Sequence, residues 1–178
     1  DENGIDFDLL VDVKEKRRAR LTEYAAEKAT ATYHEGSVWT YAGNYDIALP
    51  CATQNEINGD AAKRLVAQGV ICVSEGANMP SDLDAIAVYK ENGIFYGPAK
   101  AANAGGVAVS ALEMSQNSLR LSWTREEVDG RLKDIMTNIF NTAKTTAETY
   151  GLGKDYLAGA NIAAFENVAN AMIAQGIV

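Results

Sequence analysis

The sequence is poor in cysteine and histidine, and these shortages exclude several kinds of protein. Two cysteines, Cys51 and Cys72, can form neither a disulfide framework nor a four-ligand zinc site. No metal-ligand cluster appears, and no Ser/His/Asp triad can be assembled around the single histidine, His34. The chain has no run of about 18 apolar residues, so we expect no transmembrane helix and no membrane partner.

Positive charge is also scarce. The chain has 16 Lys and Arg residues against 24 Asp and Glu residues, a formal net charge of −8, which argues against broad nucleic-acid binding. The first residues, DENGIDFDLL, lack a basic segment, so we expect no signal peptide and predict a cytoplasmic location. With 47% apolar and 22% charged residues, the 178-residue chain has the composition of an ordinary globular domain.

A strand–loop–helix unit recurs three times along the middle of the chain. Apolar runs at 46–50, 70–74 and 94–96 are the expected strands. Helices are expected over 58–68 and from Ser81 to residue 92. Short continuous apolar strands that alternate with helices indicate an α/β fold with a parallel sheet.

The two ends of the chain show helical patterns only. An amphipathic helix over 7–28 is predicted, with Asp6 as its N-cap. After the third strand, helices are expected over 104–121 and 157–174, and between them a helix opened by the capping box Thr124–Glu127. Four side chains of the last helix are predicted to face inward: Ile162, Phe165, Val168 and Met172.

The loops after the three strands, 52–55, 76–79 and 101–106, consist of small residues and uncharged amides. Right-handed crossovers place all three loops at the carboxyl edge of the sheet, where ligands of open α/β sheets bind. Small residues let the backbone approach a flat ligand, and amides both donate and accept hydrogen bonds. The loops therefore suit a ribose, a carboxamide or a carboxylate, although glycine and asparagine are also simply turn formers.

Two further features suggest anion binding. The segment Asn103–Gly106 opens a helix, where free N–H groups and the helix dipole favour an anionic group, and Ser110 could add a hydroxyl. The alternative for Ser110 is a buried serine. Lys14, Arg17 and Arg20 lie within about 120° of arc on the predicted first helix, so they could hold a phosphate or form a solvated face.

Four blocks of the sequence resemble the C-terminal part of hexameric glutamate dehydrogenases, most closely the bacterial type that usually uses NADP. The blocks are DIALPCATQNE (46–56), EGANMP (75–80), GPAKAANAGGVAVSALEMSQN (97–117) and GANIAAF (159–165), which occur in the family's order. The resemblance covers essentially the whole chain. It implies a partial Rossmann-like three-layer α/β domain with a mainly parallel sheet, followed by an α-helical C-terminal segment.

The resemblance also implies an activity. Glutamate dehydrogenases reversibly deaminate L-glutamate to 2-oxoglutarate and ammonia, with hydride transfer to NADP or NAD, and they form homohexamers. The cofactor would lie against loop residues and a basic cluster: Ala52, Thr53, Gly76, Ala77, Asn78, Asn103, Lys14, Arg17 and Arg20. The substrate would lie against Gly106, Val107 and Ser110. The choice between NADP and NAD stays open.

The resemblance further predicts what this segment lacks. Residues 1–122 would be the second half of the nucleotide-binding domain, including the pivot helix, and residues 123–178 the helices that pack toward the substrate domain. The family's catalytic lysine and aspartate and its GxGxxG loop would lie elsewhere, so no catalytic residue and no metal are expected here and the chain alone should be inactive. Two alternatives are a non-catalytic nucleotide-binding or assembly module and a leucine or phenylalanine dehydrogenase.

Overall fold

The computed structural model describes residues 1 and 3–176. The chain divides into two compact units, Asp1–Val38 and Trp39–Val178. The expected border between residues 122 and 123 lies inside the second unit, between two of its helices.

The first unit contains two short α-helices with a π-helical turn between them. Helix α1 (Phe7–Val11) is capped by Asp6, as predicted, and leads into the π-helical turn η1 (Asp12–Lys16) before α2 (Leu21–Glu27). The prediction of one helix over 7–28 is therefore wrong. Arg18 has a φ of 52° and Arg20 is extended, which ends the helical path. Closely spaced like charges over 14–20 disfavour a continuous helix at this point.

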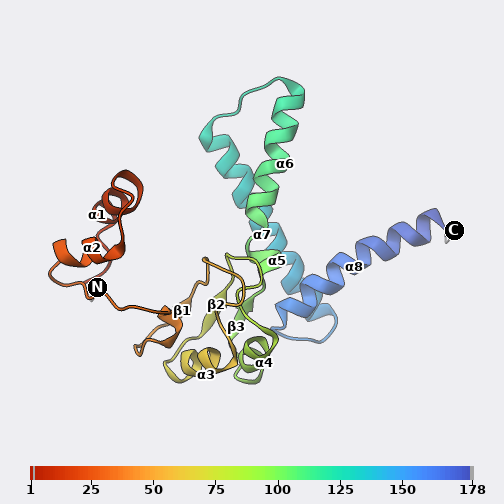
Figure 1. Cartoon of the computed structure of the whole chain (residues 1–178). Helices are drawn as coiled ribbons and strands as arrows, with labels where there is room; N and C mark the ends of the chain where they lie inside the picture. Colours follow the sequence, from red (N-terminus) through yellow and green to blue (C-terminus); the bar gives the residue numbers. More distant parts are fainter. Residues whose placement is uncertain (2, 177–178) are drawn as a thin grey trace. The chain divides into compact units, whose positions relative to one another are not determined.

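The second unit is built on the predicted parallel sheet. Strands β1 (Ile47–Ala48), β2 (Cys72–Ser74) and β3 (Phe95–Gly97) pair in parallel in the order β1-β2-β3. Helices α3 (Gly59–Ala67) and α4 (Leu83–Glu91) cover one face of the sheet (Figure 1). Successive side chains of a strand point to opposite faces of the sheet, so every second strand residue faces these helices. The side chains buried from the sheet are Ala48, Val73 and Tyr96.

The start of α4 differs from the prediction by one residue. Asp82, and not Ser81, is the N-cap, because its Oδ1 accepts a hydrogen bond of 2.8 Å from the Ala85 backbone N–H. Ser81 is buried and lies 3.3 Å from the Tyr89 hydroxyl. The serine thus belongs to the core beneath the loops.

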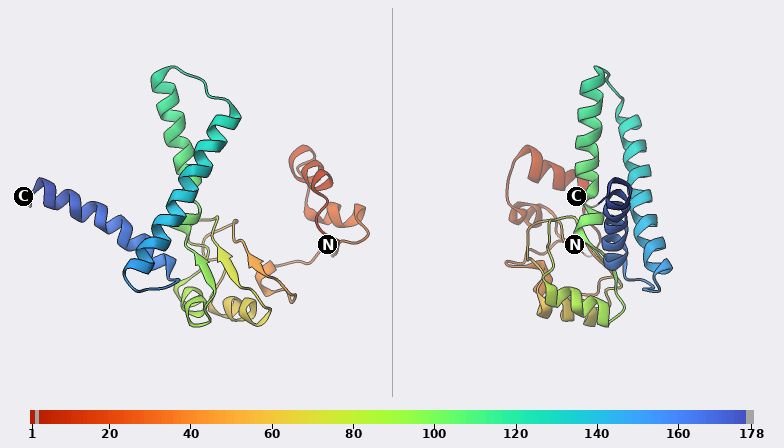
Figure 2. Two further views of the ribbon diagram at one scale, coloured as in Figure 1. Left: turned by 180° about the vertical axis from the view of Figure 1, so that it is seen from behind. Right: turned by 90° about the vertical axis from the view of Figure 1, so that its right-hand side faces the viewer.

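Four helices follow β3. They are α5 (Ala99–Ala102), α6 (Ala104–Leu119), α7 (Arg125–Thr149) and α8 (Tyr156–Gln175). The capping box of Thr124 and Glu127 is confirmed at the start of α7. The short helix α5 was not predicted, and it includes the first two residues of the segment 101–106 that was expected to be a loop. Figure 2 shows α6 and α7 as two long antiparallel helices. No helix among the described residues is long and apolar enough to cross a membrane.

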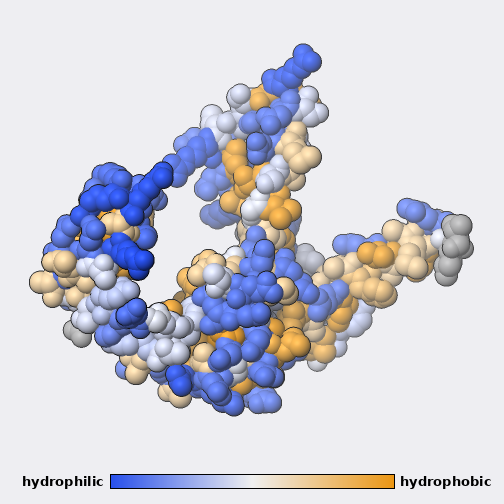
Figure 3. All heavy atoms as spheres, viewed as in Figure 1, coloured by the Kyte–Doolittle hydropathy of each residue, from blue (hydrophilic) through white to orange (hydrophobic). Residues whose placement is uncertain are grey.

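The prediction that the apolar stripe of α8 faces inward is wrong for most of its members. Phe165 is 68% exposed, Val168 57% and Met172 49%. Figure 3 shows orange, apolar surface along the helix that Figure 1 labels α8. A helical stripe indicates that an apolar partner is required but does not say where the partner lies, and no other element of the second unit covers this stretch.

Helices α7 and α8 meet through a contact that requires glycine. A Cβ atom built at Gly159 would lie 2.0 Å from the carbonyl oxygen of Ala143 and 3.0 Å from the Cβ of Ala147. All three residues are buried. The backbones can approach this closely only while residue 159 has no side chain.

A Gly159→Ala substitution is therefore expected to lower the free energy of unfolding by about 2 kcal/mol, because the clash involves rigid backbone. Gly130 lies in α7, the partner helix, and has nothing within 4 Å of a built Cβ, so it supplies the control. Gly130→Ala should raise stability by about 0.5 to 1 kcal/mol. Urea unfolding followed by circular dichroism measures both, and equal effects would contradict the close-contact account.

The start of α8 is tied to α4 by an ion pair. Asp155 is the N-cap of α8, and its other oxygen lies 2.8 Å from Lys90 Nζ. Burial alone would raise the pKa of Asp155, but the hydrogen bonds from Lys90 and from the Ala158 N–H outweigh it, so this pKa lies below 3.8.

Asp155→Asn keeps an N-cap residue but removes the charge. A depressed pKa contributes stability above the unfolded value and loses that contribution as pH falls through the folded value. We expect the variant to be less stable than wild type by about 0.5 kcal/mol at pH 7, given the half-exposed lysine. The difference should vanish at pH values well below 3.8. Urea unfolding at pH 7 and at pH 2 tests this, and a constant difference would contradict it.

Candidate functional site

The loops that follow β1 and β2 are hydrogen-bonded to each other at the carboxyl edge of the sheet. The backbone N–H groups of Gly76 and Ala77 both donate to the carbonyl of Pro50, at 3.0 Å each. Farther along, the Asn55 N–H donates to the Met79 carbonyl at 2.9 Å. The parallel sheet thus brings the two loops into one surface, as the crossover rule predicted.

The third loop joins this surface through one asparagine side chain. Asn103 stands between α5 and α6, and its Nδ2 donates to Asn78 Oδ1 at 2.8 Å and to the Ala77 carbonyl at 3.2 Å. The structure therefore brings together three of the predicted residues, Ala77, Asn78 and Asn103. These two hydrogen bonds use neither Asn78 Nδ2 nor Asn103 Oδ1. A donor and an acceptor at this junction could therefore recognise a polar group of a ligand.

Close packing holds the first two loops together. A Cβ atom at Gly76 would lie 2.5 Å from Cys51 Sγ and 3.3 Å from Cys51 Cβ, so a side chain at residue 76 would require Cys51 to move. Met79 has a φ of 48°, a conformation that costs a non-glycine residue about 1 kcal/mol or more. Strain of this kind persists where surrounding hydrogen bonds impose it, and here the Met79 carbonyl accepts the bond from Asn55.

A buried carboxylate lies directly under these loops. Glu75 is 2% exposed, and its two oxygens accept hydrogen bonds from the backbone N–H groups of Ser81, at 3.2 Å, and Ala99, at 2.8 Å. Burial and a hydrogen bond to Glu75 raise the pKa of Tyr96, and burial raises the pKa of Tyr89 to about 12. Both tyrosines therefore stay protonated at neutral pH.

A second carboxylate holds the loop after β1. Glu56 Oε1 accepts from the backbone N–H groups of Ala52 and Thr53, at 3.0 and 3.1 Å, and its Oε2 accepts from Trp39 Nε1 at 2.8 Å. Ala52 and Thr53 are exposed, and their backbone conformation depends on a side chain three or four residues away.

The predicted substrate-binding residues lie on the first two turns of α6. Gly106, Val107 and Ser110 are exposed, Val107 by 77%. The alternative that Ser110 is a buried core serine is therefore wrong. Because α6 begins directly after Asn103, these three residues continue from the junction of the loops onto the helix.

The basic cluster is arranged differently from the prediction. The residues do not share one helical face, because Arg17 ends η1 and Arg20 precedes α2. Arg17 pairs with Asp12 at 2.9 Å, with Glu23 at 3.3 Å and with Glu27 at 2.6 Å, while Lys14 Nζ donates to the Ala19 carbonyl. These hydrogen bonds, above all the one to Glu27, raise the pKa of Arg17.

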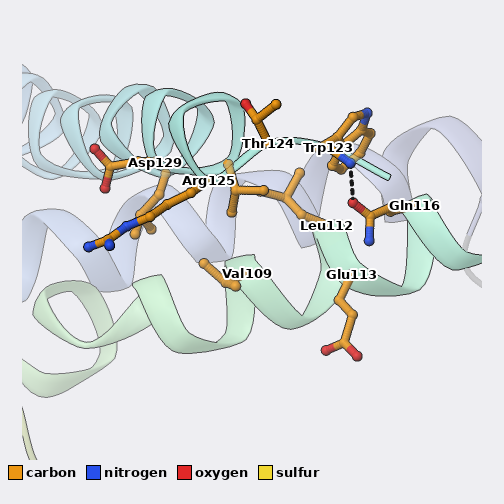
Figure 4. A pocket seen from close by; sticks show the side chains of 10 residues that line it. Val109, Leu112, Glu113, Gln116, Trp123, Thr124, Arg125 and Asp129 are labelled. Atoms are coloured by element: carbon orange, nitrogen blue, oxygen red, sulfur yellow. Dashed lines mark hydrogen bonds between the residues drawn. The ribbon is translucent and has the colours of Figure 1, made fainter. Parts of the chain in front are cut away.

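Two hollows elsewhere in the second unit have apolar linings. Figure 4 shows a groove of about 420 Å³ between α6 and α7, where the Trp123 backbone N–H donates to Gln116 Oε1 at 2.6 Å. A cavity of about 460 Å³ lies between the β2–β3 face opposite α3 and α4 and the helices α5, α7 and α8. Neither hollow is lined by a predicted site residue. The described residues contain no cluster of three or more His, Cys, Asp or Glu side chains that could hold a metal ion.

Neither Glu56 nor Glu75 was predicted from the sequence to support the loops, although each is close in sequence to a predicted site residue. Glu56 comes three residues after Thr53, and Glu75 immediately precedes Gly76. For Glu75 the available signal was an acidic residue directly after the strand Cys72–Ser74, since a carboxylate that is buried there must find donors.

A parallel sheet whose loops meet at the carboxyl ends of its strands is the arrangement that α/β domains use to bind nucleotides. The family model for glutamate/leucine/phenylalanine/valine dehydrogenases matches residues 1–176, and the chain belongs to this family. Its relatives include the NADP-specific glutamate dehydrogenases of Giardia intestinalis, 52% identical over 95% of this chain, and of Escherichia coli, 45% identical over 100%. The solved glutamate dehydrogenase of Plasmodium falciparum matches with a TM-score of 0.90 and 48% identity over 99% of this chain.

The chain spans only part of these relatives. It covers 38% of the length of the Giardia protein, 40% of the Escherichia coli protein and 38% of the Plasmodium chain. The family is thus established for this segment, while what a complete protein does must be argued separately.

The role of Glu56 can be measured by hydrogen exchange. Removing the acceptor in Glu56→Ala should speed exchange of the Ala52 and Thr53 amides about tenfold, since each loses a hydrogen bond to a charged group. Glu91→Ala, an exposed acidic residue at the end of α4, is the matched control and should leave both rates unchanged. Unchanged rates in Glu56→Ala would show that this carboxylate does not hold the loop.

Proposed function

We propose that this chain is the cofactor-holding part of an NADP-dependent glutamate dehydrogenase. The activity would be the reversible oxidative deamination of L-glutamate to 2-oxoglutarate and ammonia. The observation that carries the proposal is the junction of Ala77, Asn78 and Asn103 at the carboxyl edge of a parallel sheet, in a chain that the family model matches over residues 1–176. When bound, NADP would supply the hydride acceptor.

The residues at this edge fit a dinucleotide. The loop residues Ala52, Thr53, Gly76 and Ala77 are small, and Gly76 packs closely against the Cys51 side chain. Asn78 and Asn103 offer amide groups that can recognise a ribose or a carboxamide. In our proposal the first two loops line the adenosine and ribose side, and Asn103 lies beside the nicotinamide ribose and carboxamide.

The substrate would lie on the first turns of α6. Gly106 and Val107 present exposed backbone close to the loop junction, and the Ser110 hydroxyl is exposed one turn farther on. In the proposal this hydroxyl donates a hydrogen bond to a carboxylate of glutamate. A hydrogen bond to a charged group of this kind is stronger than one between neutral groups.

Selectivity for NADP over NAD is assigned to Lys14, Arg17 and Arg20 by the resemblance alone. Arg17 is already neutralised by three carboxylates in the first unit. Lys14 and Arg20 are therefore the better candidates to meet the 2′-phosphate. The names of the Giardia and Escherichia coli relatives support NADP as the cofactor.

In the proposal, catalysis and the assembly of subunits depend on residues outside this 178-residue segment. We propose that the catalytic lysine and aspartate belong to a separate substrate domain, that the complete protein is a homohexamer, and that this segment alone does not turn over glutamate. The relatives are about two and a half times as long as this chain, which leaves room for such a domain.

The proposal is tested in the complete protein that carries this chain. Ser110→Ala should raise the KM for glutamate about tenfold, the loss of one charge-assisted hydrogen bond, and leave the Kd for NADP unchanged. Asn103→Ala should do the reverse and weaken NADP binding about tenfold. Steady-state kinetics and fluorescence titration of the cofactor measure the two effects.

Two outcomes would count against the proposal. Absence of glutamate-dependent NADP reduction by the wild-type protein would reject the activity. If Ser110→Ala and Asn103→Ala changed glutamate and NADP handling equally, the division of the site into a cofactor edge and a substrate helix would be wrong.

A further inference from the structure

The buried carboxyl group of Glu75 is held by polar groups that carry no charge. Both of its oxygens accept hydrogen bonds from backbone N–H groups, the arrangement that suits an ionised carboxylate. Among the ion pairs of the described residues, none involves Glu75. Its other close polar neighbour is the Tyr96 hydroxyl, which remains protonated and neutral.

This charge lies under the loops to which we assign the cofactor. Glu75 directly precedes Gly76–Asn78, and its Oε2 accepts from the N–H of Ala99, the first residue of α5. The carbonyl of Ala99 in turn accepts from the N–H of Asn103 at 2.9 Å. One short helical turn therefore separates the carboxylate from the asparagine proposed to meet the nicotinamide end.

The two forms of the cofactor differ by one charge at that end. The oxidised nicotinamide ring is a cation and the reduced ring is neutral, so a nearby fixed negative charge attracts one form and not the other. For unit charges about 10 Å apart at an effective dielectric constant of about 20, the attraction corresponds to roughly a tenfold difference in affinity. Salt screens this little when the charge is buried.

We propose that Glu75 favours binding of oxidised over reduced cofactor at this edge, by the field of its uncompensated carboxylate. The inference rests on the proposed function, since it takes NADP to lie on these loops. Glu75 does not touch the reacting atoms, and it acts from beneath the loops that it also holds in place.

The test must separate the charge of Glu75 from its hydrogen bonds. In Glu75→Gln the new amide NH₂ would face a backbone N–H donor, which could unfold the loops for a reason unrelated to charge. Ala99→Pro removes that donor at the first helical position, where proline is favoured. Pro98, the preceding residue, has φ −67° and ψ 147°, the extended conformation that a following proline requires.

The experiment compares wild type, Ala99→Pro and the double variant Glu75→Gln/Ala99→Pro in the complete protein. Kd values for NADP⁺ and for NADPH are measured by fluorescence titration, without substrate. In the double variant, relative to Ala99→Pro, NADP⁺ affinity should fall about tenfold while NADPH affinity changes less than about twofold. Ala99→Pro alone keeps the charge and should keep the wild-type ratio of the two Kd values.

The outcomes distinguish this inference from the proposed function. If the wild-type protein bound neither form, the cofactor site itself would be rejected. If it bound both but the ratio were the same in the double variant and in Ala99→Pro, Glu75 would only be a structural support and the inference would be overturned. A ratio already shifted in Ala99→Pro would also overturn it, because geometry and not charge would then set the preference.

Discussion

A carboxylate that is removed from water must find hydrogen-bond donors, and in this chain that requirement organises the carboxyl edge of the sheet. Glu75 directly follows strand β2 and is buried, so it accepts from the backbone N–H groups of Ser81 and Ala99. Those donors belong to the segments that follow β2 and β3. The hydrogen bonds of this one side chain therefore fix the two segments relative to each other. They also fix Asn103, because its backbone N–H is hydrogen-bonded to the carbonyl of Ala99.

The same principle operates at the neighbouring loop. Glu56 satisfies two backbone N–H groups that no regular secondary structure would pair, and Trp39 supplies its third donor. Loops built of small residues have few side-chain contacts of their own to define a conformation. Here the acidic side chains of Glu56 and Glu75 define the loop conformation through hydrogen bonds to the backbone. The exposed loop surface itself consists of small and polar residues.

The helical part of the chain shows the opposite situation, in which apolar surface is not covered. Phe165, Val168 and Met172 are largely exposed on α8, although their spacing is that of a buried stripe. In the same helix Gly159 is packed against α7 as tightly as backbone allows. The N-terminal part of α8 is thus packed against α7, while the apolar face of its C-terminal part is largely exposed among the described residues.

The sequence alone determined the fold class, the three parallel strands, the cap at Asp6, the capping box at Thr124 and the family, because short-range patterns and local motifs specify these. It also indicated the loop residues Ala77, Asn78 and Asn103 correctly as neighbours, since parallel strands must end at one edge. Only the tertiary structure decided where the helix at 7–28 breaks, which partners Arg17 takes, and that α8 leaves its stripe exposed. It alone decided the roles of Glu56 and Glu75 as well. These features depend on which groups, far apart in the sequence, come together in a buried or charged environment. A local pattern of residues does not specify such contacts.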